Sequence, residues 1–224
     1  LDVLKAAQIA HDEGIAIPIL LGNKEVILEL KKELEFDADI LIIDPNSDES
    51  NTTKDDYAVK FCETSNRSGV GMYGARIKMR ERNYFGAMMV REGDADGMIS
   101  GYSRAYPTVV KPIFEVIGKA SDVKRVATVN IMITERGPLF LADTAINIDP
   151  NGEELAEIAK MTANVARTFG FQPVMAMLSY ANFGSSNHPN AAKVKQAVKI
   201  LHESNPELVV DGEVQIDFAL NKEL

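Results

Sequence analysis

The chain has 224 residues, of which 46% are hydrophobic and 25% charged, so it is long enough and apolar enough to bury one large core or two small ones. Its net charge of −9 argues against a general surface for nucleic acid or for an anionic membrane. The single cysteine, Cys62, excludes an internal disulfide and favours a reducing, cytoplasmic location, and no apolar run is long enough to cross a bilayer.

Apolar spacing and turn residues predict the elements of the first half. In chain order we expect a helix ending at Gly14, a buried strand over 17–22, a helix over 24–34, a strand over 38–44, a polar loop over 44–56, helical pieces over 55–93 with breaks near 66–71 and 80–83, a strand over 96–100, and a helix over 108–118.

The second half continues this alternation. It predicts two β-rich runs over 123–133 and 137–146 joined by a hairpin-like turn, a helix over 152–170 with one apolar face from Leu155 to Phe169, a strand over 173–178, a helix over 191–203, and a strand leading to a short helix over 207–220. Repeated strand-then-helix units indicate an α/β fold with a largely parallel sheet. A change in composition over 118–124 marks a hinge, so we expect two lobes, 1–119 and 120–224.

Two polar segments follow predicted strands and lead into helices. In open α/β sheets ligands bind at the carboxyl ends of strands, and a helix N-terminus offers N–H groups to an anion. Both segments therefore indicate binding of a phosphate or carboxylate, although a capped loop with surface cations is the structural alternative. The candidate residues are Ser100, Gly101, Arg104 and Lys111 in the first segment, and Asn182, Gly184, Ser185 and Ser186 in the second.

The sequence gives weaker evidence for a catalytic or dinucleotide-binding motif than for the two polar segments. A lone histidine, His188, is typical of a structural residue near a helix start, and no acid–base pair or nucleophile triad is recognisable. The G-x-G-x-x-G pattern at 69–74 follows a polar, helix-like segment, whereas a dinucleotide fingerprint must follow a strand. The sequence therefore indicates binding, with no catalytic residue assigned.

Two further clusters favour structural interpretations. Residues 76–82 hold four basic side chains, which is typical of a solvated helix face that packs through Ile77 and Met79; a ligand role requires that the charges face a cleft. Asp143, Asn147 and Asp149 carry oxygen ligands but at no known metal-loop spacing, and helix capping by Asn151 accounts for the segment, so no metal site is assigned.

Several strings in this order resemble the phosphate acetyltransferase/butyryltransferase family across essentially the whole chain. They are NYFGAMMVREGDADGMISG, FLADTAIN, EELAEIA, MLSY and DGE-QID. The string ANFGSS, residues 181–186, resembles the C-terminal domain of large hybrid NADP-dependent malic enzymes, whereas ordinary phosphate acetyltransferases tend to read S-T-K/R-G-S there.

The resemblance implies a two-lobed, isocitrate/isopropylmalate dehydrogenase-like fold with a cleft on which the two polar segments converge. In the family the first segment contributes to the CoA and phosphate region. Here Arg104 stands where a His is usual, and Lys111 stands where an Arg is usual. Lysine keeps the charge but lacks the bidentate fork that grips a phosphate, which argues against acetyl-phosphate chemistry.

The resemblance also implies that the chain is a fragment, because it begins inside the first family helix and ends before a Ser-Arg-Gly segment. We expect an acyl-CoA-binding regulatory and oligomerisation domain, at least a dimer, with acetyl-CoA or a related acyl-CoA as its ligand. It would need no cofactor itself, whereas a malic enzyme region of the same chain would convert malate to pyruvate and CO2 with NADP and Mg or Mn. An active phosphate acetyl- or butyryltransferase and a pure assembly module remain the alternatives.

Overall fold

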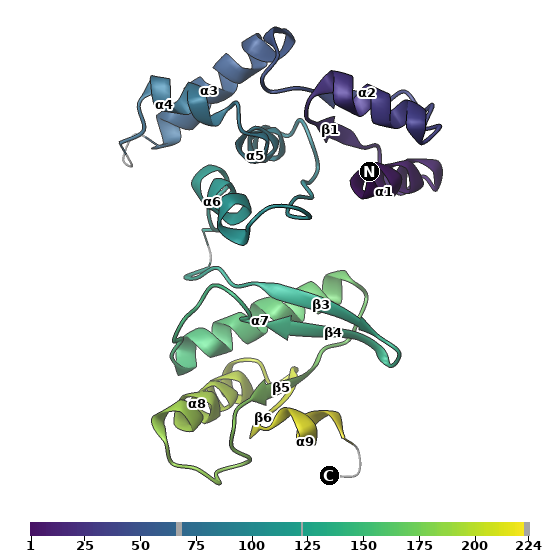
Figure 1. The fold of residues 1–224 in the computed structure, drawn as a ribbon. Coiled ribbons are helices and arrows are strands. Elements are labelled where there is room, and N and C mark those ends of the chain that lie inside the picture. The colour runs from purple at the N-terminus through teal and green to yellow at the C-terminus, as the bar shows by residue number, and fades with distance from the viewer. Residues whose placement is uncertain (66–68, 122, 222–224) are drawn as a thin grey trace. The chain divides into compact units, whose positions relative to one another are not determined.

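The computed structural model describes residues 1–65, 69–121 and 123–221. The chain divides into two compact units, Leu1–Gly118 and Lys119–Leu224 (Figure 1), whereas the boundary expected from composition lies between residues 119 and 120. Each unit combines helices with a short parallel ladder, so the expected α/β class is confirmed, with small parallel and antiparallel sheets.

The first unit is mainly helical. Its elements are α1 (Asp2–Asp12), β1 (Ile19–Leu21), α2 (Lys24–Glu33), β2 (Leu41–Ile43), the 3-10 helix η1 (Asp48–Ser50), α3 (Asn51–Ser65), α4 (Met72–Lys78), α5 (Arg82–Glu92) and α6 (Tyr106–Val116). Strands β1 and β2 pair in parallel, with Ile19 opposite Leu41. Gly93 ends α5 in the left-handed conformation at φ +82°, as the sequence predicts.

Helix α5 lies at the centre of the larger core of this unit. Every residue from Tyr84 to Met89 is buried, because α3, α4 and α6 surround the helix. Such all-round burial explains why α5 has no amphipathic stripe. A smaller core around Leu4, Phe36 and Ile40 joins α1 and α2 to the β1–β2 pair.

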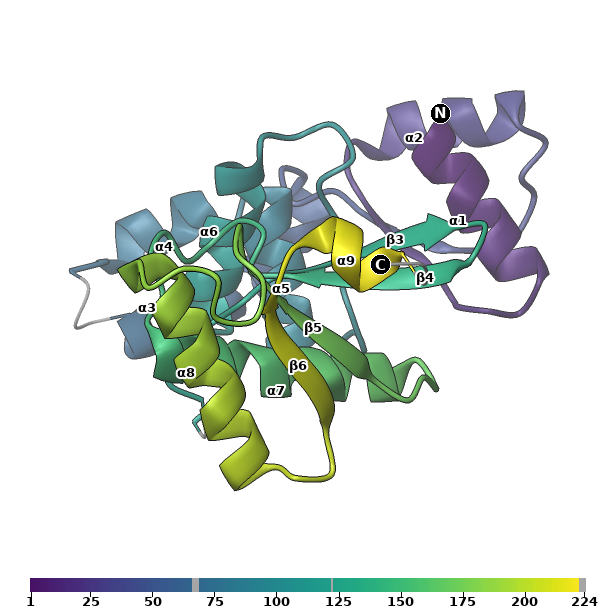
Figure 2. The same cartoon turned by 90° about the horizontal axis from the view of Figure 1, so that it is seen from below.

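The second unit carries the hairpin and the other parallel pair. Its elements are β3 (Val129–Thr134), β4 (Gly137–Ala142), α7 (Gly152–Thr168), β5 (Val174–Leu178), α8 (Pro189–Ser204), β6 (Val209–Val214) and α9 (Ile216–Leu220). β3 and β4 pair antiparallel, as expected for the hairpin-like turn, and β5 pairs in parallel with β6. Helix α7 packs on α8 and β4, and α8 packs on β6 (Figure 2).

Helix α7 follows its sequence signals closely. The Asn151 side chain accepts a hydrogen bond from the Glu154 N–H, and the Glu154 carboxylate accepts one from the Asn151 N–H, which completes a capping box. Gly170 follows the helix with φ +81°. The exception is Phe169, which was expected on the buried face but is exposed and instead contacts Phe140, with ring centroids 5.9 Å apart.

Two secondary-structure predictions in the first unit are wrong. Residues 51–56 were expected in a loop but begin α3, because the Ser50 hydroxyl donates to the carbonyls of Asp44 and Ser47 and closes the preceding turn. Residues 96–100 were expected as a strand but are irregular; Ile99 is fully exposed, and no backbone hydrogen bond joins this segment to another described segment.

Residues 96–100 are held by side-chain packing and not by the backbone hydrogen bonds of a β-ladder. The Met98 sulfur lies so close to Gly86 of α5 that a Cβ added there would be 2.6 Å from it. Ser100 and Gly101 consequently do not end a strand in this structure. Among the described residues, no helix is long and apolar enough to cross a membrane.

Candidate functional site

The best-defined candidate site is the turn that follows β5, residues 179–188. Its backbone folds back on itself at Phe183 and Gly184, which adopt φ +42° and +84°. Glycine adopts this left-handed region at little cost, whereas phenylalanine does so only when its surroundings hold it there. Contacts from Glu213, near the end of β6, and from Gln215, just after that strand, provide that constraint.

Glu213 fixes the tip of this turn. Its side chain is only 1% exposed, and its carboxylate accepts the Gly184 N–H at 2.5 Å. The backbone carbonyl of Glu213 accepts the Phe183 N–H at 2.8 Å. One buried acid therefore holds two consecutive residues of the turn through charge-assisted and backbone hydrogen bonds.

Gln215 fixes the base of the same turn. Its N–H donates to the Asn182 Oδ1 at 2.7 Å, and the Asn182 Nδ2 donates back to the Gln215 Oε1 at 2.9 Å. The Gln215 side-chain amide also donates to the Tyr180 carbonyl at 2.6 Å. The predicted ligand residue Asn182 thus uses both side-chain atoms to shape the turn.

The two serines are likewise engaged inside the turn. The Ser185 hydroxyl accepts the Asn182 N–H at 3.0 Å, and the Ser185 N–H donates to the Asn182 carbonyl at 2.9 Å. The Ser186 hydroxyl lies 2.9 Å from the Tyr180 hydroxyl and accepts the His188 N–H at 3.2 Å. The structure therefore presents a preformed turn in which the N–H groups of Gly184 and Ser185 already have acceptors.

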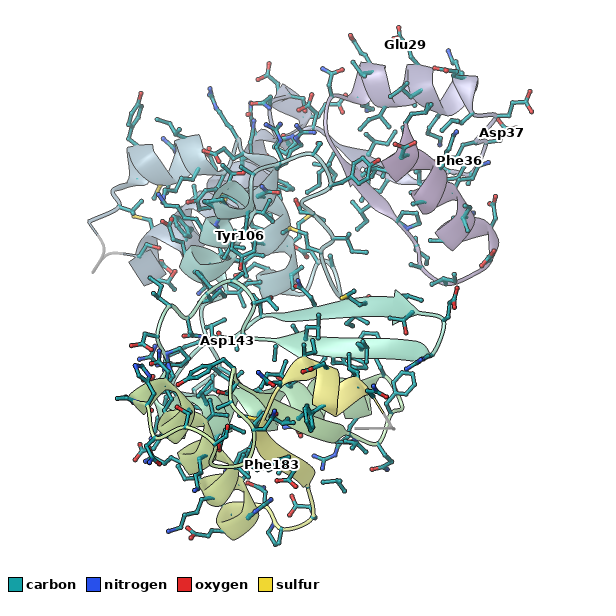
Figure 3. The ribbon with its side chains drawn as sticks, turned by 60° about the horizontal axis from the view of Figure 1, so that its bottom comes forward. Glu29, Phe36, Asp37, Tyr106, Asp143 and Phe183 are labelled. Carbon is teal, nitrogen blue, oxygen red and sulfur yellow. The ribbon has the colours of Figure 1, made fainter. Side chains whose placement is uncertain are left out.

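The outer surface of the turn is aromatic and positively charged. Phe183 (labelled in Figure 3) is 61% exposed, and Tyr180 is 56% exposed. The Lys195 ammonium of α8 lies 3.8 Å from where a Cβ on Gly184 would sit. This surface can offer a planar apolar contact and a cation to an anionic ligand.

In the first unit, the other candidate segment is held by Asn83 of α5. The Ser100 hydroxyl donates to the Asn83 Oδ1 at 2.7 Å, and the Asn83 Nδ2 donates to the Thr108 carbonyl at 3.1 Å. Gly101 adopts φ +111°, a conformation that disfavours any residue with a Cβ. Asn83 thereby joins the start of the segment to the first turn of α6, whose first residue, Tyr106, is labelled in Figure 3.

The two cations of this segment differ in their surroundings. Arg104 is exposed and has no side-chain partner among the described residues. The Lys111 ammonium lies 3.8 Å from the Glu115 carboxylate, one turn along α6. Burial would raise the pKa of Glu115, but hydrogen bonds from Lys78 and Tyr84, together with the charges of Lys78 and Lys111, lower it below its ordinary value.

Sequence reasoning missed the side chains that support both segments. Glu213 and Gln215 lie in the string DGE-QID, and Asn83 begins the string NYFGAMMV. The resemblance therefore included these residues but assigned them no structural or functional role. In the sequence, Lys195 is only a basic residue on a predicted amphipathic helix, and nothing there indicates that it lies near the turn. All four act through tertiary contacts, which residue spacing does not encode.

The acidic segment before α7 forms structural contacts. The Asn147 Nδ2 donates to the Asp143 Oδ1 at 2.9 Å and to the Val126 carbonyl at 3.1 Å. Lys193 donates to Asp149 at 2.5 Å, and this bond lowers the pKa of the Asp149 carboxyl. Within the described ranges, no group of three or more His, Cys, Asp or Glu side chains is placed to hold a metal ion.

Comparison with known proteins gives this geometry a family context. The family described as "Phosphate acetyl/butaryl transferase" matches residues 1–224. A phosphotransacetylase structure from Streptococcus pyogenes superposes with a TM-score of 0.83 at 36% identity, covering 99% of this chain and 67% of that one.

Curated relatives fall into two kinds. The phosphate acetyltransferase of Thermoanaerobacterium thermosaccharolyticum is 39% identical over 228 residues, covering 99% of this chain and 68% of that protein. The NADP-dependent malic enzyme of Escherichia coli is 35% identical over 223 residues, covering 97% of this chain but only 29% of that protein. The chain thus spans about two thirds of one relative and less than a third of the other.

Proposed function

The chain belongs to the phosphate acetyl/butyryl transferase family, and from that premise we propose that it is the acyl-CoA-binding regulatory and oligomerisation domain of a hybrid malic enzyme. Malic enzyme relatives support this proposal because the matching segment is under a third of their length, so in them it is one part of a longer chain. We place it in the cytoplasm, as at least a dimer.

The observation that carries the regulatory proposal is Lys111, which stands where an arginine is usual in the family. An acyl transferase must hold phosphate in a fixed geometry, for which a bidentate arginine is suited. Lys111 provides a single ammonium group whose charge is shared with Glu115 at 3.8 Å. This arrangement suits attraction of an anionic carrier better than alignment of phosphate for attack.

The ligand in this proposal is acetyl-CoA or a related acyl-CoA. The proposed ligand residues of the first unit are Ser100, Gly101, Arg104 and Lys111, and those of the second unit are Asn182, Gly184, Ser185 and Ser186. Exposed aromatic rings at Tyr180 and Phe183 would cover part of the carrier. Regulation requires that acyl-CoA bind two states of the parent enzyme with unequal affinity.

Malate oxidation belongs to another region of the proposed parent protein. That region would bind NADP and Mg²⁺ or Mn²⁺ and convert malate to pyruvate, CO2 and NADPH. In this proposal the present domain contributes only the acyl-CoA site and subunit contacts.

A second candidate is an active phosphate acetyl- or butyryltransferase. The observation in its favour is the 39% identity to a phosphate acetyltransferase over 68% of that protein. Here the same residues would align CoA and phosphate for direct acyl transfer.

Two assays on the full-length protein separate the candidates. The regulatory proposal predicts that acetyl-CoA changes the rate of malate oxidation by fivefold or more, within the usual range of allosteric coupling, while acetyl phosphate formation stays at background. Robust acetyl phosphate formation with no effect on malate oxidation would instead support the transferase. The double variant Arg104→His and Lys111→Arg, which restores the residues usual in the family, is the matched control for residual transfer.

A further inference from the structure

A small cavity lies between α3 and α4 in the first unit and shares no residue with the candidate segments above. Its volume is about 70 Å³, and it is lined by Asn51, Lys54, Asp55, Arg76 and Arg80. The two helices pack against each other (Figure 1). A space of this size has room for more than one water-sized group.

The lining carries more positive than negative charge. Arg76 donates through Nε to the Asp55 carboxylate at 2.9 Å, so the single acid of the lining is already paired. Lys54 and Arg80 supply the remaining two charges. The contrast with the chain's net charge of −9 marks this cavity as a local anion-attracting site.

Lys54 is the decisive residue. It is only 7% exposed, and its ammonium donates to the Ser47 carbonyl at 2.9 Å. An ammonium group has three donors, and within the described ranges no carboxylate forms an ion pair with this one. A buried charge is costly without a counter-charge, so Lys54 is set to accept an anion as a ligand.

Arg80 completes the arrangement from the rim. It is exposed, and its guanidinium has no side-chain partner in the part of the chain that the structure describes. Arg76 and Arg80 are four residues apart and line the same cavity, so these two members of the basic run do face a hollow. Met79 of that run is fully buried as expected, whereas Ile77 is exposed and does not pack as predicted.

We propose that this cavity binds a phosphate group, held by Lys54 and Arg80 with Arg76 as a third, acid-anchored cation. A tetrahedral dianion matches the two unneutralised charges, and a guanidinium can meet two phosphate oxygens at once. Free phosphate and a phosphate monoester share this chemistry. The proposal does not depend on acyl-CoA binding, because none of its residues takes part in that site.

The test is an amide-resolved NMR titration of the ¹⁵N-labelled chain with inorganic phosphate at constant ionic strength. We expect saturable shifts at the signals of 51–55 and 76–80. Arg80→Met should weaken the affinity about tenfold or more, as expected for loss of a charge-assisted hydrogen bond. Lys32→Met, which removes one exposed charge from α2, is the matched control and should change the affinity less than twofold.

Lys54→Met gives a second, independent readout. It should abolish the shifts while the protein, in phosphate-free buffer, unfolds at the same or a higher temperature, because a buried unpaired charge is removed. Repeating the titration with glycerol 3-phosphate distinguishes the sources: tighter binding than that of inorganic phosphate indicates an ester ligand, and loss of binding indicates free phosphate.

Two results would overturn the proposal. One is the absence of saturable shifts at 51–55 and 76–80, even if shifts occur at 100–111 or 182–186, which would support the acyl-CoA site alone. The other is equal weakening by Arg80→Met and Lys32→Met, which would show general charge screening.

Discussion

At the scale of single residues, the turn after β5 depends on one buried carboxylate. Glu213 accepts the Gly184 N–H at 2.5 Å and is almost inaccessible to water. Removing one partner of a buried charge-assisted bond leaves the other unsatisfied, which costs more than the bond itself contributes. The stability of the unit and the shape of the turn are therefore coupled through this side chain.

We predict that Glu213→Ala lowers the free energy of unfolding by about 3 kcal/mol and Glu213→Gln by less, because glutamine retains a carbonyl acceptor for Gly184. Urea denaturation followed by circular dichroism measures both. Glu203→Ala, on the exposed face of α8, is the control and should cost less than about 0.5 kcal/mol. A loss below 1 kcal/mol for Glu213→Ala would show that the turn does not need the carboxylate.

At the scale of elements, Glu115 joins three helices of the first unit. Its carboxylate accepts hydrogen bonds from Lys78 at the end of α4 and from Tyr84 of α5, the latter at 2.7 Å. The Lys78 ammonium also lies over the rings of Phe61 and Tyr84, at 5.3 and 4.9 Å from their centroids. This partly buried network fixes α4, α5 and α6 against one another.

The network gives stability a defined pH dependence. Burial raises the pKa of Glu115, but the bonds from Lys78 and Tyr84 outweigh it, so the folded-state pKa lies below the ordinary 4.5. A carboxyl with a lowered folded pKa stabilises the protein above its unfolded pKa and loses that contribution as pH falls through the folded pKa. Glu115→Gln should therefore cost about 1–2 kcal/mol at pH 7.

Denaturant melts at several pH values test this sign. The difference between wild type and Glu115→Gln should be constant above pH 5.5 and should shrink as pH falls below 4.5. A difference that stays constant down to pH 3, or that grows, would contradict the account. Glu49→Gln, which removes an exposed ion pair with Lys24, should show no such trend.

Helices α7 and α8 cross where only glycine fits. A Cβ on Gly152 would lie 2.9 Å from the Lys193 carbonyl and 2.7 Å from the Gln196 side chain. Since a backbone atom cannot move aside as a side chain can, Gly152→Ala should cost about 1–3 kcal/mol. Gly97→Ala, where a Cβ meets nothing within 4 Å, should be neutral or slightly stabilising. Thermal melts of the Gly152→Ala and Gly97→Ala variants test this prediction. Equal melting temperatures of the two variants would contradict close packing at Gly152.

At the scale of the whole molecule, patterns that local chemistry determines were predictable from sequence. The Asn151 capping box, the Gly93 and Gly170 helix ends and the β3–β4 hairpin follow from residues adjacent in the chain. The irregular conformation of residues 96–100 was not predictable in this way, because a strand needs a pairing partner and Met98 instead packs on Gly86. Local pattern does not identify that partner.

The candidate site also has parts that the sequence predicts and parts that only the structure shows. The sequence predicted two polar segments, and the structure adds their supports, Asn83 for the first and Glu213 and Gln215 for the second. These residues lie 17 to 33 positions away from the residues that they hold, so only the fold brings them together. The family strings contain these residues but do not indicate their structural role.

The central claim is that this domain binds an acyl-CoA, and isothermal titration calorimetry of the chain with acetyl-CoA tests it most directly. The account predicts saturable binding, weakened about tenfold by Lys111→Met through loss of a charged contact and abolished by Ser185→Trp, which places a bulky ring in the turn. Absence of binding at millimolar acetyl-CoA, with the wild-type protein folded by circular dichroism, would contradict it.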